Sequence, residues 1–273
     1  MNLLVTFIPV ESKRLIAKAV TVLPEVIAAM QKGRVVIGNG TSTAYVAEEL
    51  LHTEMEKWKF PSGVITSGRQ CQTPVDRLRP LMIIKGQVKS PNMDIPMYDE
   101  FEDFISSFTS TDVFIKGANA IDSDGNAGFL LAHANGGQIG MSLGTIAAQG
   151  SHLIVPVGLE KMIGSVTEAA RNVPGINNFR YSFGRGTGYL AVNNAKVITE
   201  IEALRILTGV KAVHLASGGV GGTEGAVTLS VSGEEQQVCA TVDLVRQLKK
   251  EKPFQSWRMS CIKCQFKCSF QEK

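Results

Sequence analysis

The chain has 273 residues, of which 44% are hydrophobic and 19% are charged, a balance typical of a globular protein and not of a disordered one. Its length predicts one large domain, or one domain with a subdomain, that folds without disulfides or a metal. No apolar stretch approaches the roughly 20 residues of a membrane-spanning helix, and the apolar start lacks the basic region of a signal peptide. We therefore expect a cytoplasmic protein with reduced thiols.

The formal net charge of +3 is unevenly distributed along the chain. Residues 249–273 hold seven basic and two acidic side chains, a local charge of +5, which leaves 21 basic and 23 acidic side chains, or −2, in residues 1–248. A slightly acidic body offers no basic surface for nucleic acid. We expect neither a nucleic-acid nor a membrane partner.

In the first half of the chain, helices alternate with short apolar strands. Helical spacing of apolar residues predicts a helix over 11–31 that ends at Gly33. A strand at 34–37 and a turn at 38–43 precede a helix over 43–52. Further strands are predicted at 63–66, 80–84, 113–115 and 153–157, with an acidic helix over 99–108. Continuous apolar strands between helices favour an α/β fold in which residues 1–174 form a three-layer, Rossmann-like, mostly parallel sheet.

The second half has a different pattern. Strands are predicted at 189–192, 212–215 and 226–231, and helices over 200–208 and 235–250. This pattern indicates a small α+β subdomain over 175–250, followed by a basic tail at 251–273 that contains three of the five cysteines.

The turn after the strand at 34–37 has the composition of an anion site. A Gly-x-Gly turn lets the backbone approach a ligand, and the N-terminus of the following helix presents free N–H groups and a positive dipole. Three hydroxyls add donors, which suits a phosphate or a carboxylate; the alternative is a simple helix cap. The turn is neither a Walker loop nor a complete GxGxxG motif. The residues predicted to bind the anion are Gly38, Asn39, Gly40, Thr41, Ser42 and Thr43.

The segment 36–44 resembles the phosphate loop of type A ribose-5-phosphate isomerases. Three further segments follow in the same order as in that family: 66–69 resembles its second Thr-Ser loop, 112–122 its Asp-Gly-Ala-Asp-Glu-Val-Asp strand end, and 135–137 its glycine-rich loop. The similarity covers about residues 11–160. It implies the fold of the superfamily of ribose-5-phosphate isomerase, glucosamine-6-phosphate deaminase and CoA transferase, whose members commonly form homo-oligomers. It also implies ligand contacts at Thr66, Ser67, Gly136 and Gly137.

The chain departs from this family at the catalytic positions. Where the family has two aspartates in the third segment, this chain has Lys116 and Asn119, and only Asp122 persists. The family's catalytic glutamate follows the glycine-rich loop, whereas residues 140–145 contain no carboxylate. Moving a proton between adjacent carbons requires a base, so we expect the pocket to be kept and the isomerase reaction to be lost. The resemblance implies that Lys116, Asn119 and Asp122 face the reacting part of the ligand.

Other residues allow two interpretations. Lys116 stands at the carboxyl end of a buried strand, where open α/β sheets place ligand contacts. His133 is either a general base or, as is more common for a lone histidine, structural. The segment 184–188 is either an arginine-bearing anion loop or a hinge, which we favour, and 217–225 is either a lid or a hairpin connection.

The tail carries Cys261, Cys264 and Cys268. Two residues between cysteines allow both sulfurs to reach one metal, so the tail predicts a zinc or iron–sulfur site, although three ligands are one short of a closed site. A Cys-x-x-Cys redox pair and an exposed basic tail that merely contains thiols are the alternatives.

These observations predict a divergent enzyme that binds a phosphorylated or carboxylated small metabolite. Two alternatives stay open. One is a non-catalytic metabolite sensor with a metal- or redox-active cysteine tail, and the other is a CoA transferase-like enzyme with a glutamate nucleophile.

Overall fold

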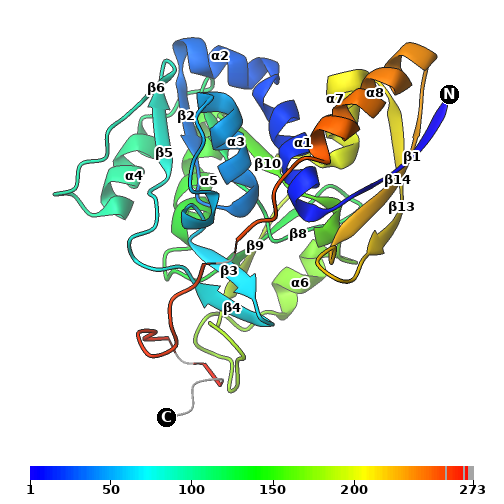
Figure 1. The fold of residues 1–273 in the computed structure, drawn as a ribbon. Helices are drawn as coiled ribbons and strands as arrows, with labels where there is room; N and C mark the ends of the chain where they lie inside the picture. The colour runs from blue at the N-terminus through cyan, green and yellow to red at the C-terminus, as the bar shows by residue number, and fades with distance from the viewer. Residues whose placement is uncertain (256, 267, 270–273) are drawn as a thin grey trace.

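A computed structural model describes residues 1–255, 257–266 and 268–269. The fold is mixed α/β around a six-stranded, mostly parallel sheet with the strand order β12-β10-β7-β2-β5-β6 (Figure 1). Four neighbouring strands run parallel: β12 (Lys196–Ile198), β10 (His152–Pro156), β7 (Val113–Ile115) and β2 (Arg34–Ile37). The strand β5 (Leu81–Ile84) runs antiparallel to β2, and the edge strand β6 (Gln87–Val88) runs antiparallel to β5. The predicted α/β class with a mostly parallel sheet is confirmed.

The single helix predicted over 11–31 is wrong. The segment forms two helices, α1 (Pro9–Thr21) and α2 (Pro24–Lys32). Pro24 has no N–H to donate, and its ring disfavours helical geometry in the preceding residue. Leu23 accordingly has a ψ of 133°, in the extended region, and α2 starts afresh at the proline.

The other predicted helices are present within a few residues of their expected bounds. They are α3 (Thr41–Leu51), α4 (Met97–Ser106), α7 (Glu200–Thr208) and α8 (Glu235–Leu248). The structure adds α5 (Gly137–Gln149), α6 (Val166–Asn172) and two short 3-10 turns, η1 (Lys57–Lys59) and η2 (Leu159–Lys161). Among the residues described, no helix has both the length and the apolar composition needed to cross a membrane.

Three smaller antiparallel sheets surround the main one. The first joins β1 (Asn2–Phe7), β14 (Ala226–Ser232) and β13 (Lys211–Gly218), so the N-terminal strand completes the unit that contains α7 and α8. The second joins β11 (Gly188–Val192), β9 (Ala127–Leu131) and β8 (Ala120–Ile121). The third is a hairpin of β3 (Gly63–Thr66) and β4 (Arg69–Gln72). The segment 175–250 therefore pairs partly with the first half of the chain, since β11 joins β9 and β12 joins β10.

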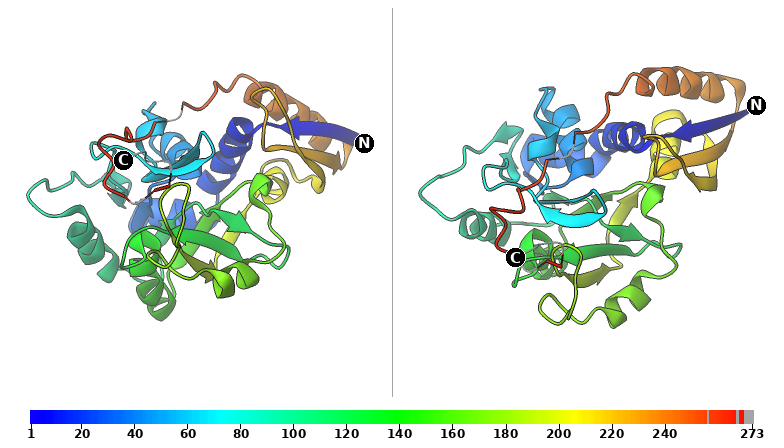
Figure 2. Two further views of the ribbon diagram at one scale, coloured as in Figure 1. Left: turned by 90° about the horizontal axis from the view of Figure 1, so that it is seen from below. Right: turned by 60° about the horizontal axis from the view of Figure 1, so that its bottom comes forward.

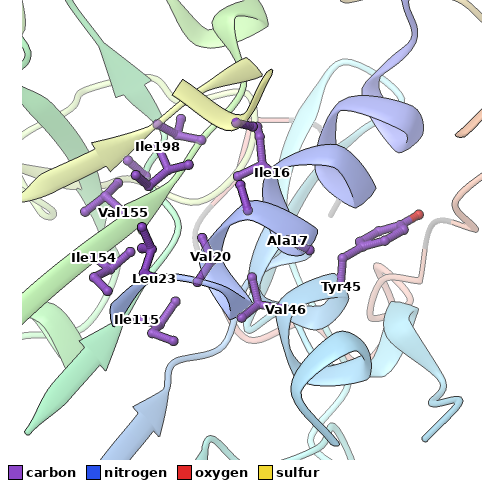
Figure 3. Packing of buried hydrophobic residues seen from close by; sticks show 14 of the residues in the cluster. Ile16, Ala17, Val20, Leu23, Tyr45, Val46, Ile115, Ile154, Val155 and Ile198 are labelled. Atoms are coloured by element: carbon purple, nitrogen blue, oxygen red, sulfur yellow. The ribbon is translucent and has the colours of Figure 1, made fainter. Parts of the chain in front are cut away.

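Apolar side chains from α1 and α3 pack on the parallel strands (Figure 3). Val20 of α1 and Val46 of α3 are fully buried beside Ile115, the last residue of β7. Burying each such side chain contributes about 1.5–3 kcal/mol. This packing holds the ends of β2, β7 and β10 at fixed positions under the helices.

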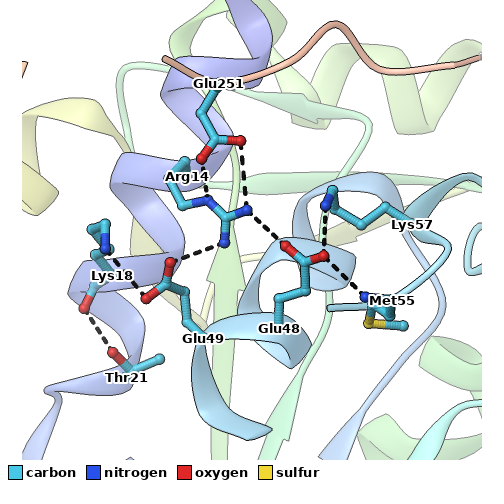
Figure 4. Close-up of polar contacts among 8 residues, drawn as sticks. All are labelled: Arg14, Lys18, Thr21, Glu48, Glu49, Met55, Lys57 and Glu251. Carbon is cyan, nitrogen blue, oxygen red and sulfur yellow. Dashed lines mark hydrogen bonds and ion pairs between the residues drawn. The ribbon is translucent and has the colours of Figure 1, made fainter. Parts of the chain in front are cut away.

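A partly buried arginine joins α1 to α3 and to the start of the tail (Figure 4). The Arg14 guanidinium bonds to carboxylate oxygens of Glu48 at 2.6 Å, Glu49 at 2.9 Å and Glu251 at 2.6 Å. It also lies 4.8 Å from the ring centroid of Tyr45. Because α3 begins at the predicted anion loop, this network helps to fix the position of that loop.

A second buried carboxyl group lies at the start of α7. The side chain of Glu200 is fully buried; its Oε2 accepts a hydrogen bond from the Leu159 N–H at 2.8 Å, whereas its Oε1 has no hydrogen-bond partner in the described part of the chain. Burial and the nearby Glu160 raise the pKa of Glu200 from 4.5 to about 7. Ionisation of this group therefore opposes folding at neutral pH.

We expect Glu200→Gln to stabilise the protein above pH 7. The folded-state pKa is raised, so the stability contributed by the protonated form is fully present below pH 4.5 and is lost as the pH rises through about 7. At pH 8 the free energy of unfolding should rise by about 1–3 kcal/mol, with little change at pH 4.5, in urea titrations. The control is Glu235→Gln, at an exposed position of α8. An equal effect of Glu200→Gln at pH 4.5 and pH 8 would contradict the raised pKa of Glu200.

Candidate functional site

Three parallel strands end at one cavity of about 420 Å³. The chain leaves β2 at Gly38 and β7 at Lys116, and Lys161 follows β10 within a few residues. Parallel strands bring their carboxyl ends to the same edge of a sheet, which is where α/β proteins bind ligands. Lys116 and Lys161 line the cavity together with residues of the β3–β4 hairpin, of β9 and of the start of α5.

The N-terminus of α3 lies at the cavity. Thr41 and Ser42 both line it. Ser42 is only 2% exposed, and its Oγ has no hydrogen-bond partner among the residues described. The Thr43 hydroxyl, by contrast, donates to the Gly38 carbonyl at 2.6 Å. Ser42 thus offers an unused hydroxyl to a ligand, whereas Thr43 closes the turn.

The N-terminus of α5 lies at the same cavity. Gly136 and Gly137, which the resemblance to the isomerases implicated, line it at the start of this helix. Gly136 has a φ of +73°, and a Cβ there would lie 2.9 Å from the Cα of Gly140, so the turn requires glycine. Two helix N-termini therefore present N–H groups and partial positive charge to one space.

Asn39 and Gln138 lock these two helix starts together. The Asn39 N–H donates to Gln138 Oε1 at 2.9 Å, and Gln138 Nε2 donates back to Asn39 Oδ1 at 2.7 Å. The Asn39 amide also donates to the carbonyls of Phe60 at 2.6 Å and Leu78 at 3.0 Å. Asn39 is 2% exposed, so its side chain organises the site, although the residue also borders the cavity.

Among the residues described, four cationic side chains line the cavity: Arg77, Lys116, Lys161 and Arg185. Lys116 Nζ donates to the Asn39 carbonyl at 2.8 Å, and Lys161 Nζ to the Ala118 carbonyl at 2.8 Å. Arg185 Nη1 donates to Gln72 at 2.6 Å, and Nη2 to the Ala132 carbonyl. The Nε of Arg77 is buried without a hydrogen-bond partner among the residues described. Within that part of the chain, no aspartate or glutamate lines the cavity.

Burial changes the acidity of both lysines. It lowers the pKa of Lys116 from 10.5 to about 8, and repulsion from Lys161 adds to this effect. It also lowers the pKa of Lys161. The burial of two ammonium groups at one cavity favours either deprotonation or the binding of an anion.

The far side of the cavity is aromatic and apolar. The rings of Tyr98 and His133 lie 4.5 Å apart, and the Arg185 guanidinium lies 3.7 Å from the ring centroid of Phe266. Phe266 belongs to the C-terminal tail, which runs beside the β3–β4 hairpin (Figure 2). The Met259 N–H, for example, donates to the Gln72 carbonyl at 2.9 Å. The tail thus contributes a wall of the site.

Several predicted site residues lie at the rim of the cavity or outside it. Asn119 is exposed at the rim, where its Oδ1 accepts the Leu130 N–H at 3.0 Å. Thr66 and Ser67 form the tip of the β3–β4 hairpin and do not line the cavity; Ser67 has a φ of +51°, typical of a tight hairpin turn.

Asp122 also lies outside the cavity and holds a turn together. Its carboxylate accepts the N–H groups of Asn126 at 3.0 Å and Val166 at 2.9 Å. Burial by itself would raise the pKa of this carboxyl group, but the hydrogen bonds from Asn126 and Val166 outweigh that effect and lower it. These contacts give Asp122 a structural role at the start of α6.

The tail cysteines make separate contacts. Cys261 Sγ lies 3.5 Å from Arg258 Nη1, and Cys268 Sγ accepts the Gly184 N–H at 3.1 Å. Across the residues described, no group of three or more His, Cys, Asp or Glu side chains is placed to hold a metal ion. The zinc or iron–sulfur site at Cys261, Cys264 and Cys268 stays a prediction.

Sequence reasoning did not assign Lys161, Gln138, Arg77 or Phe266 to the site, and it favoured a hinge at Arg185. One signal was available for Lys161, which follows β10 much as Lys116 follows β7. Gln138 reaches the cavity from the first turn of α5, and the others from loops and from the tail, whose positions no local pattern encodes. The glycine-rich segment at 217–225 connects β13 to β14 and does not line the cavity.

Comparison of the chain with protein-family models, with curated proteins and with solved structures found no match. The assignment of the site therefore depends on its geometry.

We expect Asn39→Asp to destabilise the protein by about 2–4 kcal/mol. The aspartate would turn an oxygen toward the Phe60 and Leu78 carbonyls, which now accept the amide N–H groups, so both carbonyls would lose their donor and face a repelling oxygen. Urea unfolding at pH 7 measures the change. Asn119→Asp is the control, because Asn119 is exposed and the aspartate keeps the acceptor for the Leu130 N–H. Equal stabilities for the two variants would contradict the role of Asn39.

Proposed function

We propose that the protein binds a phosphorylated or carboxylated small metabolite in this cavity and acts on it as a divergent enzyme. One observation carries the proposal: two helix N-termini and four basic side chains converge on a cavity whose described lining contains no carboxylate. Each helix N-terminus is equivalent to about half a positive charge. An anion would satisfy the free N–H groups and relieve the repulsion between the two lysines.

The form of the cavity supports a small ligand with an anionic head. Its volume of about 420 Å³ lies within the ~300–1,000 Å³ common for small-molecule sites. The helix starts and the buried hydroxyl of Ser42 lie on one side, and Phe129, Leu131 and Phe266 contribute apolar surface. The head would lie at the helix starts, with the body of the metabolite along the apolar wall.

We further propose that the main sheet is the centre of a three-layer, Rossmann-like domain related to the superfamily of ribose-5-phosphate isomerase, glucosamine-6-phosphate deaminase and CoA transferase. Support comes from two adjacent residues of β7, whose side chains point to opposite faces. The Phe114 ring lies 6.0 Å from Phe101 of α4, whereas Ile115 lies beside Val20 of α1 (Figure 3). Helices then cover both faces, as this architecture requires.

The lack of a carboxylate favours a second candidate, a non-catalytic metabolite sensor. An isomerase needs a base and a CoA transferase needs a glutamate nucleophile, and the described lining has neither an aspartate nor a glutamate. Lys116 and His133 line the cavity and are of residue types that act as general bases. Binding of phosphosugars without turnover would favour the sensor over the enzyme.

We expect phosphorylated ligands to raise the melting temperature, and Lys161→Met to weaken their binding about tenfold. A tenfold loss corresponds to about 1.4 kcal/mol, in the range of one charge-assisted contact. Calorimetric titration with inorganic phosphate and a panel of phosphosugars and acyl-CoAs measures the affinities. Lys211→Met, exposed on β13, is the control. The proposal fails if no ligand of the panel binds, or if Lys161→Met and Lys211→Met bind the ligands equally.

The affinity should fall as the pH rises through about 8. Lys116 loses its proton near this pH in the free protein, whereas a bound anion favours the charged form and raises the pKa. Binding above pH 8 should therefore take up a proton. Titrations between pH 7 and 9.5, where a phosphate monoester is fully ionised, in buffers of different ionisation enthalpy detect this uptake. An affinity independent of pH would exclude Lys116 as a cationic contact.

A further inference from the structure

We propose that Lys116 is an amine nucleophile that forms a Schiff base with a phosphorylated or carboxylated aldehyde or ketone bound in the cavity. The inference rests on the proposed function, because the helix N-termini must hold the anionic end of this compound. It names the substrate class and gives the site a reaction that needs no carboxylate nucleophile.

The position of Lys116 favours attack on a bound carbonyl group. The residue directly follows β7, which lies between the strands that lead to the α3 start and to Lys161. Its side chain passes closely over Gly38, where a Cβ would lie 2.6 Å from the Lys116 Cδ. The absence of a side chain at Gly38 therefore makes room for the lysine to reach the cavity that it lines.

In the part of the chain that the structure describes, backbone carbonyls hold the Lys116 amine, and it forms no ion pair. Nζ donates to the Asn39 carbonyl at 2.8 Å and lies 3.5 Å from the Gly117 carbonyl. Because an ammonium group has three donors, two backbone acceptors leave one direction open. The Asn39 carbonyl is itself fixed by the pairing of Asn39 with Gln138, so the amine has a defined place.

The nucleophile must be the neutral amine, and the charges around the cavity favour that form. Burial and the neighbouring Lys161 lower the pKa of Lys116 to about 8. A desolvated lysine next to a second cation is the usual arrangement of Schiff-base lysines. The titratable groups that line the cavity from other elements are Cys71, Arg77, Tyr98, His133, Lys161 and Arg185.

The reaction balances without a cofactor or an oxidant. The lone pair of Nζ attacks the carbonyl carbon, and the carbonyl oxygen takes a proton to form a carbinolamine. The C–O bond then breaks, water leaves, and nitrogen forms a double bond to carbon. The overall change is amine plus carbonyl compound to imine plus water. A protonated imine withdraws electrons from the adjacent C–H bond, which lowers the strength of base needed to remove that proton.

Reductive trapping with two matched pairs of phosphorylated probes tests the inference. Pyridoxal 5′-phosphate and glyceraldehyde 3-phosphate carry an aldehyde, whereas pyridoxine 5′-phosphate and glycerol 3-phosphate carry an alcohol in its place. The full-length protein is incubated with each aldehyde and sodium borohydride, which adds hydride to the imine carbon and leaves a stable secondary amine. Peptide mass spectrometry then locates the label.

We expect the label chiefly on Lys116, suppressed at least tenfold by an excess of the matching alcohol. Labelling should rise with pH and level off above about 8, whereas exposed lysines should continue to gain label toward 10.5. Lys116→Met should lose the site-specific label and Lys211→Met should retain it. The label positions found in the wild-type protein do not depend on how well either variant folds.

The alcohols distinguish the proposed anion site from the proposed Schiff base, because they carry the phosphate but no carbonyl group that could form an imine. If an alcohol binds but the aldehydes label other lysines, or label Lys116 without protection, the Schiff base is overturned and the anion site stands. If neither alcohol binds in calorimetric titrations, and no ligand of the phosphate, phosphosugar and acyl-CoA panel binds either, the proposed function fails and the inference fails with it.

Discussion

The site depends on the paired hydrogen bonds between Asn39 and Gln138. They join the turn after β2 to the first residues of α5, two segments 99 residues apart in the chain. The same asparagine holds the carbonyls of Phe60 and Leu78 and accepts from Lys116. Because every polar atom of this side chain is used, the two helix N-termini and the lysine amine have one relative arrangement. Ligand affinity and stability therefore depend on the same few bonds.

The charges of the cavity are the basis of the proposed anion site. Lys116 and Lys161 share a desolvated space with Arg77 and Arg185, and the lining residues described include no carboxylate to neutralise them. Burial is the main cause of the lowered pKa of both lysines, and repulsion from Lys161 adds to the effect at Lys116. A bound anion would relieve the repulsion between the cations. Loss of a proton from one lysine would relieve it too, and would also create a nucleophile. Binding and reactivity are thus two responses to the same electrostatic strain.

The basic tail has a more specific place than its charge suggested. Its described contacts are largely aromatic and backbone interactions: Phe254 lies 6.4 Å from Tyr45, Trp257 lies 6.0 Å from the amine of Lys59, and Phe266 packs on Arg185. Glu251 begins this path by its ion pair with Arg14. The net charge of +3 is therefore the sum of −2 in a body that has a cationic cavity and +5 in a tail that helps to enclose this cavity.

The sequence by itself predicted β2, β5, β7 and β10 of the main sheet, the turn at 38–43 and the place of Lys116 after a strand, because these depend on local patterns of apolar residues, glycine and hydroxyls. It did not predict the short strands β6 and β12 of the same sheet. It did not predict the break between α1 and α2, where one proline outweighs a continuous apolar stripe. Only the tertiary structure decided that Thr43, Asp122 and the hairpin tip at Thr66 and Ser67 serve the fold. It also decided that Gln138, Lys161, Arg185 and Phe266 meet at the cavity. The physical reason is that a local pattern records propensity and face, whereas a site is a convergence of distant segments, fixed by strand order and by buried hydrogen bonds such as those of Asn39.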